Sequence, residues 1–157
     1  MPPLQTVYRD NQPAYSLGRR VNMEEWNTAT FVNTQSASIA FGVPVVADGG
    51  EIGTKNLTAA GENILGITEA DLTVGGAFAK GDNVPVCEVG CIAVELGANV
   101  TRGAQARFDL TAKKWTGGAA SATVMTIPGA QFDEAGVSGQ LGVVRYRRPV
   151  PSLSAGA

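Results

Sequence analysis

From Ala37 onward, the chain consists of short apolar runs separated by turn residues, and this pattern limits the folds that it can adopt. The runs are four to seven residues long and are separated by clusters of Gly, Asp and Asn. Amphipathic helices need a longer pattern with a period of 3.6 residues, whereas strands bounded by turn residues fit short runs. The 20 glycines and 8 prolines agree with many tight turns. The pattern predicts an all-β body.

Several of the apolar runs are nearly continuous, such as GVPVV at residues 42–46. Such runs are typical of strands that are covered on both faces in a small barrel or sandwich. The predicted fold class is therefore all-β: a compact β-barrel, β-clip-like or sandwich domain with an extended N-terminal arm. The predicted strands span residues 38–47, 64–70, 83–88, 91–96, 106–109, 124–127 and 142–146.

The two ends of the chain differ from this regular body. Pro2, Pro3 and Pro13 remove amide donors and disfavour helix around them. We predict an extended N-terminal arm over residues 1–36, a β domain over 37–148 and a flexible C-terminal tail over 149–157. A short helix at 23–28 is a second interpretation within the arm, and Trp26 and Phe31 are expected where the arm joins the body.

The side chains that most enzymes need are missing or badly placed. The chain has no histidine, which removes the commonest general base and the commonest zinc ligand. Asp82 stands where a phosphate loop that starts at Gly76 would need lysine. Paired acids such as Glu24 and Glu25 are expected to be solvated loop residues. We predict that the chain is not an enzyme and binds no metal, cofactor or small-molecule substrate.

Two cysteines and one tryptophan leave alternatives open. Cys87 and Cys91 would lie ~13 Å apart along a straight strand, but a hairpin turn at 88–90 would let them face each other. Two unpaired apolar thiols in a reducing compartment are the favoured interpretation. Trp115 is followed by a Gly-Gly pair, as at a hairpin tip, and burial in the core is favoured over an exposed position on a binding surface.

The net charge of −2 hides an uneven distribution. Residues 1–20 carry three Arg and one Asp, and residues 145–157 carry three Arg and no acid, which leaves six basic and thirteen acidic residues, or −7, between them. Basic ends can contact nucleic acid or an acidic protein surface. No basic run interleaved with aromatics is present, so we expect no nucleic-acid partner. No apolar stretch approaches ~20 residues and no signal peptide is recognisable, so we expect no membrane association and synthesis in the cytoplasm.

Six runs and one turn follow one another in an order and at a spacing that together are specific. They are IAFGVPVV (39–46), ILGIT (64–68), AKGDNVPV (79–86), GCIAVE (90–95), the turn at Gly103, IPGAQF (127–132) and GQLGVVR (139–145). On these segments, residues 14–147 resemble the structural cement, or head decoration, proteins of tailed bacteriophages.

This resemblance implies a non-enzymatic structural protein of the virion, made in the host cytoplasm and bound to the outer surface of the capsid. It implies a β-barrel-like or clip-like body that stabilises the phage head by bridging neighbouring capsomers. The implied partners are the major capsid protein and further copies of the chain, commonly as a homotrimer. The long arm before Ile39 departs from the family pattern and leaves the arm geometry and the oligomeric state open.

Two groups of residues are expected to contact the capsid, where their arginines would pair with acids on the shell. A last strand with outward-facing arginines would explain the second group equally well. An alternative is another virion component, such as a tail or receptor module that binds sugars through Trp115 and loop acids. The first group is Val7, Tyr8, Arg9, Tyr15, Arg19 and Arg20, and the second is Arg145, Arg147 and Arg148.

Overall fold

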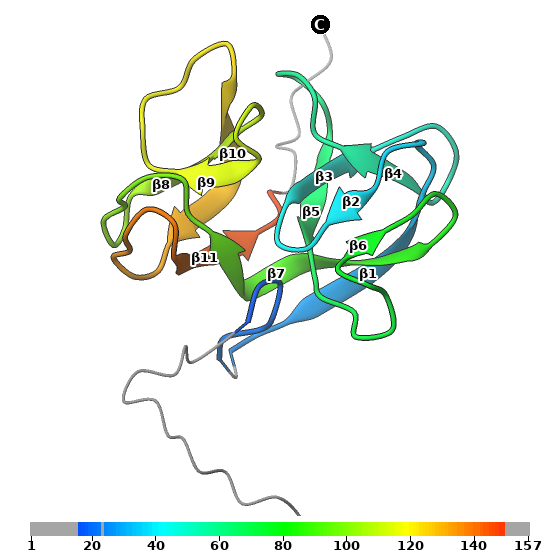
Figure 1. The fold of residues 1–157 in the computed structure, drawn as a ribbon, viewed down its shortest axis with the longest axis horizontal. Coiled ribbons are helices and arrows are strands. Elements are labelled where there is room, and N and C mark those ends of the chain that lie inside the picture. The colour runs from blue at the N-terminus through cyan, green and yellow to red at the C-terminus, as the bar shows by residue number, and fades with distance from the viewer. Residues whose placement is uncertain (1–15, 23, 150–157) are drawn as a thin grey trace, which may run out of the picture.

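One long strand, β7 (Asn83–Glu95), organises the protein. The computed structural model describes residues 16–22 and 24–149. The first half of β7 pairs with β1 (Asn27–Asn33) and β5 (Ile64–Thr68), and its second half pairs with β11 (Leu141–Arg147), always antiparallel. β7 therefore belongs to two lobes, which lie side by side in Figure 1.

The first lobe is a small closed barrel. Its strands follow the order β1-β4-β3-β5-β7, and the additional pairing of β1 with β7 closes the ring. Here β3 spans Pro44–Ala47 and β4 spans Gly53–Asn56, and only the β1–β4 pair is parallel. A two-stranded ribbon of β2 (Ile39–Ala40) and β6 (Ala77–Phe78) adds Ile39 and Phe78, both fully buried, to the core.

The second lobe continues from the other half of β7. Its order is β7-β11-β10-β8-β9, where β8 spans Gln105–Asp109, β9 spans Lys114–Thr116 and β10 spans Val124–Phe132. Beyond the end of β7, the Gly97 amide donates to the Trp115 carbonyl at 2.8 Å, which brings β9 back to the starting strand. The buried apolar side chains of both lobes form one continuous cluster.

Trp115 joins the two lobes. Its side chain is 1% exposed, and its indole Nε1 donates to the carbonyl of Gly42, in the turn before β3, at 2.7 Å. The Phe108 ring packs edge-on against it with a centroid separation of 5.6 Å. This confirms the prediction that Trp115 belongs to the core.

Three polar side chains are buried inside the first lobe, and each is satisfied by backbone carbonyls. The Asn33 amide donates to Ala37 and Phe78, and the Thr54 hydroxyl donates to Val46. Thr68 donates to Ala40 and accepts from the Val43 amide. A buried polar group without a partner costs about 1–3 kcal/mol, so these bonds fix where the loops attach to the barrel.

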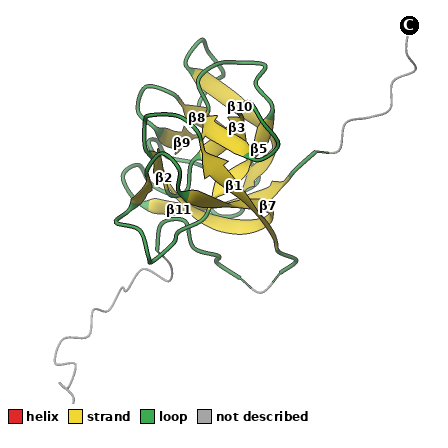
Figure 2. Cartoon of the chain, turned by 90° about the vertical axis from the view of Figure 1, so that its right-hand side faces the viewer, coloured by secondary structure: helices red, strands yellow, loops and turns green. Residues whose placement is uncertain are grey.

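The all-β, barrel-like fold class is confirmed: residues 16–22 and 24–149 form strands, turns and loops with no helix (Figure 2). The short helix at 23–28 is wrong, because residues 27 and 28 belong to β1. The expected strand at 38–47 is divided by a turn at residues 41–42, and the two strands expected at 83–88 and 91–96 are one. Strands β1, β4, β6 and β9 were not predicted.

The region assigned to the N-terminal arm is described from Ser16 onward, and there its backbone is hydrogen-bonded to the body. Residues 16–22 lie against the second half of β7, and β1 closes the first lobe. The strand prediction failed for β1 because four of its seven residues are polar and much of it stays exposed. Val7, Tyr8, Arg9, Tyr15 and the chain from Val150 onward lie outside the described residues.

We expect Trp115→Phe to lower the free energy of unfolding by about 1–3 kcal/mol, because it leaves the Gly42 carbonyl without its donor in the core. Urea unfolding followed by circular dichroism measures this. Leu72→Ala is the control: its side chain is 83% exposed, so we expect a change within about 0.5 kcal/mol. Equal stability of the Trp115 variant and the wild type would contradict a structural role for the bond.

Candidate functional site

The N-terminal segment, residues 16–22, runs along the central strand. The Gly18 amide donates to the Ala93 carbonyl at 2.8 Å, and the Ala93 amide donates back to Arg19 at 3.0 Å. The Val21 amide donates to the Cys91 carbonyl at 3.1 Å. This pairing fixes the path of the backbone and leaves the side chains of Arg19 and Arg20 exposed.

Gly18 determines how closely this segment approaches the body. Its φ of +72° favours glycine, and a Cβ there would lie 2.8 Å from the Ala70 nitrogen and 2.9 Å from the Phe41 Cβ. The Ala70 amide in turn donates to the Gly18 carbonyl at 2.9 Å. Any larger residue would collide with Ala70 and Phe41 and push the segment away from the body.

Trp26 holds the next part of the chain, where the arm was expected to join the body. Its ring covers Gly90 of β7, where a Cβ would lie 2.1 Å from a ring carbon, and the Arg20 guanidinium lies 4.9 Å from the ring centroid. The indole Nε1 donates to the Thr28 hydroxyl, which donates to the Glu69 carboxylate at 2.6 Å. Burial raises the pKa of Glu69 above its ordinary value.

Three arginines at the end of β11 form a charged cluster with acids from distant parts of the chain. We call this set of residues the β11 charge cluster. Arg145 binds Glu24 through both terminal nitrogens and Asp133 through Nε at 3.1 Å. The ion pairs Arg147–Glu25, at 2.6 Å, and Arg148–Glu88, at 3.0 Å, complete the cluster.

The arginines of the cluster are neutralised within the chain, because four carboxylates face three guanidinium groups and leave a net charge of −1. The hydrogen bonds that Arg145 donates to Glu24 and Asp133 raise the pKa of its guanidinium above the ordinary value. The arginine side chains remain 46% exposed at Arg145 and 69% at Arg147, so each exposed pair is worth at most about 1 kcal/mol. The cluster ties Glu24 and Glu25, just before β1, to the last strand and presents charge to solvent.

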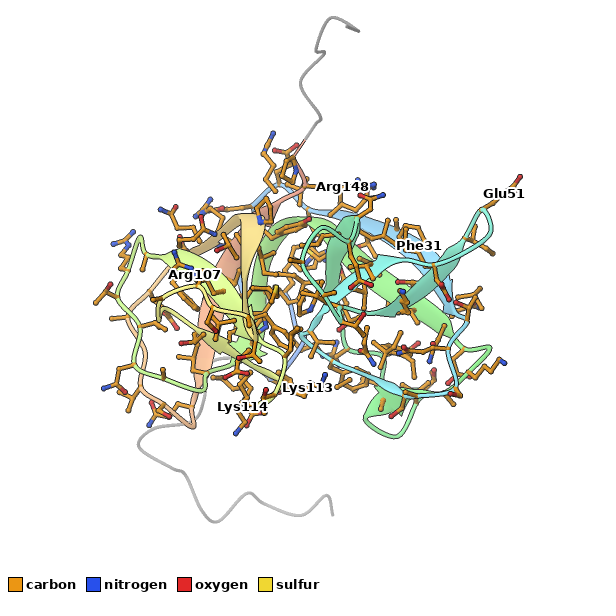
Figure 3. All side chains as sticks on the ribbon, turned by 90° about the horizontal axis from the view of Figure 1, so that it is seen from above. Phe31, Glu51, Arg107, Lys113, Lys114 and Arg148 are labelled. Atoms are coloured by element: carbon orange, nitrogen blue, oxygen red, sulfur yellow. The ribbon has the colours of Figure 1, made fainter. Side chains whose placement is uncertain are left out.

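The predicted contact arginines lie at two places in the structure. Arg19 and Arg20 line a depression of about 310 Å³ together with Trp26 and Glu69. Arg148, labelled in Figure 3, belongs to the β11 charge cluster. The acids that pair with these arginines were not predicted as part of a site.

Other basic side chains lie on the second lobe in Figure 3, and they are engaged locally. Arg107 donates to the Thr126 hydroxyl and to the Gly118 carbonyl, and Lys114 pairs with Glu95 at 2.9 Å. These contacts stabilise the hairpins of β8, β9 and β10.

The described residues contain no reactive centre of a familiar kind. Cys87 and Cys91 are both free and buried, and a hairpin turn between them is wrong because β7 passes through both. Burial raises the pKa of Cys87 to about 12 and also raises the pKa of Cys91, which makes both thiols poor nucleophiles. Within residues 16–22 and 24–149, metal-ligating side chains do not gather in groups of three or more. The same residues include no helix long and apolar enough to span a membrane.

Comparisons with known proteins relate this architecture to phage heads. The family model described as "Structural cement protein (E217 gp24/Pam3 gp6)" matches residues 4–147. A chain from the solved structure "The capsid of Myoviridae Phage XM1" shares the fold, with a TM-score of 0.69 and 19% sequence identity. That alignment covers 94% of this chain and 98% of the phage chain. No curated protein matches the sequence.

We expect Glu24 and Arg145 to be coupled by about 0.5–1 kcal/mol in a double-mutant cycle of Glu24→Gln and Arg145→Gln, because their side chains form a two-point ion pair at the surface. Urea unfolding of the four proteins measures the coupling. It should fall in 1 M NaCl, where the screening length is about 3 Å. A coupling of zero at low salt would contradict a role of the pair in holding Glu24 against β11.

Proposed function

The chain belongs to the phage structural cement protein family, whose members stabilise the capsid as part of the virion, and from this we propose that it binds the outer face of the head and bridges neighbouring capsomers. The observation that carries this proposal is the family match over residues 4–147, because it includes the N-terminal region and both lobes. We therefore propose that both the folded body and the N-terminal residues before it take part in binding.

A cement acts through contact area and avidity. Capsomers that separate under internal pressure must break every contact with a protein that spans them, so many weak contacts act together. A rigid body favours this role because little conformational entropy is lost on binding. The two lobes of this chain share β7 and one apolar core, which provides such a body.

We propose that the N-terminal residues make the main capsid contact. The support is the pairing of residues 16–22 with β7, which anchors the chain directly after residues 1–15. Arg19 and Arg20 are exposed there and can pair with acids on the shell. The proposed contact residues are Val7, Tyr8, Arg9, Tyr15, Arg19 and Arg20, with Arg145, Arg147 and Arg148 as a second patch.

The proposed partners are the major capsid protein and further copies of this chain, as a homotrimer. On binding, the arginines of the second patch would leave the carboxylates of their own chain and pair with those of a neighbouring protein. Breaking an exposed ion pair costs little free energy. We further propose that the chain has no catalytic activity. The absence of histidine and the high pKa of Cys87, about 12, support this.

The alternative, a receptor or sugar-binding module of the tail, loses its main support. It required an exposed Trp115 to stack on a sugar ring, and Trp115 is 1% exposed with its nitrogen bonded to Gly42. No other described feature favours it over the cement function.

We expect purified virions to contain this chain in a simple fixed ratio to the major capsid protein, giving hundreds of copies per particle, because a cement covers the whole shell. Quantitative mass spectrometry of the virions measures the ratio. A few copies per particle would assign the chain to a vertex or the tail, and absence from the virion would contradict the proposal.

Deletion of residues 1–15 should weaken binding to capsids that lack this protein by at least ~tenfold, because the bridging contact is lost while the body still folds. Co-sedimentation with such capsids measures affinity, and thermal unfolding checks that the body is intact. The single substitution Arg9→Ala should weaken binding as well, whereas Arg102→Ala, at an exposed turn of the second lobe, serves as a matched control. Full affinity after the deletion would refute the assignment of the contact to these residues.

A further inference from the structure

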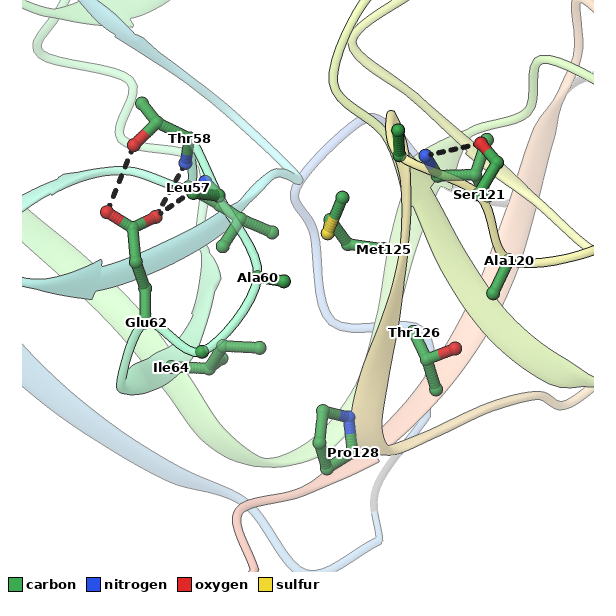
Figure 4. A pocket seen from close by; sticks show the side chains of 14 residues that line it. Leu57, Thr58, Ala60, Glu62, Ile64, Ala120, Ser121, Met125, Thr126 and Pro128 are labelled. Carbon is green, nitrogen blue, oxygen red and sulfur yellow. Dashed lines mark hydrogen bonds between the residues drawn. The ribbon is translucent and has the colours of Figure 1, made fainter.

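A groove of about 550 Å³ lies where the two lobes face each other. One wall is the loop at residues 57–62 with Ile64 of the first lobe, and the other is the first half of β10 with residues 120–122 of the second. In Figure 4, Leu57 and Met125 point toward each other across it, and Pro128 lies at one end. The volume is within the range of clefts that hold a ligand or a short segment of chain.

The groove is apolar and effectively uncharged. Its lining consists mainly of aliphatic side chains, alanines, Met125 and Pro128. Among the described residues that line it, only Glu62 is charged, and its carboxylate accepts from the Thr58 and Ala59 amides at 2.7 and 3.0 Å and pairs with Lys55 at 3.2 Å. These bonds hold its pKa below the ordinary value. The groove therefore fits an uncharged, apolar occupant.

The chain leaves the body beside this groove. A Cβ on Gly129, the neighbour of the lining residue Pro128, would lie 3.3 Å from the Cδ of Pro149, so the last described residue lies next to β10 one position beyond the groove lining. The Arg148 amide donates to the Glu88 carbonyl at 2.8 Å and fixes this exit. The eight residues that follow, VPSLSAGA, contain no charged side chain, and three of the first four are apolar.

The prolines explain why strand β11 does not itself extend along the groove. Backbone N–H and C=O groups point to alternate sides along a strand. The Asp133 amide donates to the carbonyl of Val143, whereas the Arg148 amide donates to Glu88 of β7. The backbone groups of odd-numbered residues in β11 therefore point toward β10, and those of even-numbered residues point toward β7. Positions 149 and 151 are therefore the next two that would donate to β10, and both are proline. Pairing of β11 with β10 is limited to residues 130–132 of β10, and residues 124–128 stay unpaired on that side.

We propose that residues 150–157 fold back into the groove of their own chain, with the side chains of Val150, Pro151 and Leu153 against Leu57, Ile64 and Met125. Apolar contact replaces the strand ladder that the prolines prevent. Eight residues can reach about 26 Å when extended, and attachment at the groove's end gives a millimolar effective concentration. This docking does not depend on capsid binding. It would join the lobes at the side opposite β7.

Disulfide trapping tests the proposal. The full-length variant Ala60→Cys with Leu153→Cys should form an intramolecular disulfide under mild oxidation, since Ala60 lies in the groove wall and the native thiols are buried. Mass spectrometry and non-reducing electrophoresis distinguish monomer from dimer. The control is Leu72→Cys with Leu153→Cys, in the exposed loop between β5 and β6, which should cross-link at least ~tenfold more slowly. Disulfide-linked dimers would assign the groove to a second copy, and equal rates in the two variants would show that the groove is empty; either result overturns the proposal.

Hydrogen exchange provides a second measurement that does not need new cysteines. Ending the chain after Pro149 should increase exchange at residues 57–64 and 124–128, and Leu153→Asp should do the same, whereas Ser154→Asp should change less. No change in either variant would overturn the proposal. Protection that appears only after capsids are added would instead assign the groove to a capsid protein.

Discussion

The continuity of β7 is the constraint on which the rest of the structure depends. Its first half provides the strand that β1 and β5 need to close one barrel, and its second half provides the strand from which β11, β10, β8 and β9 extend. The change of partners happens at Gly90, whose φ of 146° and missing side chain make room for the Trp26 ring. A side chain there would displace Trp26 and with it the attachment of the N-terminal segment.

The fold class followed from the sequence because the strands that build the core are apolar runs of ordinary length. The strands that the sequence did not reveal are stabilised by tertiary contacts. β1 is mainly polar and is ordered by pairing with β7 and by Asn33, whose amide binds two carbonyls inside the barrel. β7 was divided in two because Gly90 is typical of a turn, and only its ring contact with Trp26, 64 positions earlier, explains a glycine within a strand.

Of the ion pairs in the candidate site, the sequence predicted the arginines and not their acidic partners. An alternating last strand identified the arginines of β11 as outward-facing, and the structure agrees for Arg145 and Arg147. Their acidic partners could not be found, because Glu24 is 121 residues away from Arg145 and no local pattern marks a pair at that distance. The burial of Trp115 was expected from the general behaviour of tryptophan, but its bond to Gly42 depends on how the lobes meet.

A protein that resists separation of capsomers must transmit force between its contacts, and this fold offers a short path. Residues 16–22 are hydrogen-bonded directly to β7 at Cys91 and Ala93 rather than to an edge strand. Tension on the residues that precede them would load these bonds in shear along the strand, so that several must break together. From β7 such a force would pass into both lobes through the strand ladders of its two halves. Exposed ion pairs such as Arg147–Glu25 resist separation only weakly, so under the proposed attachment we expect the backbone pairing, and not the surface charge, to carry most of the load.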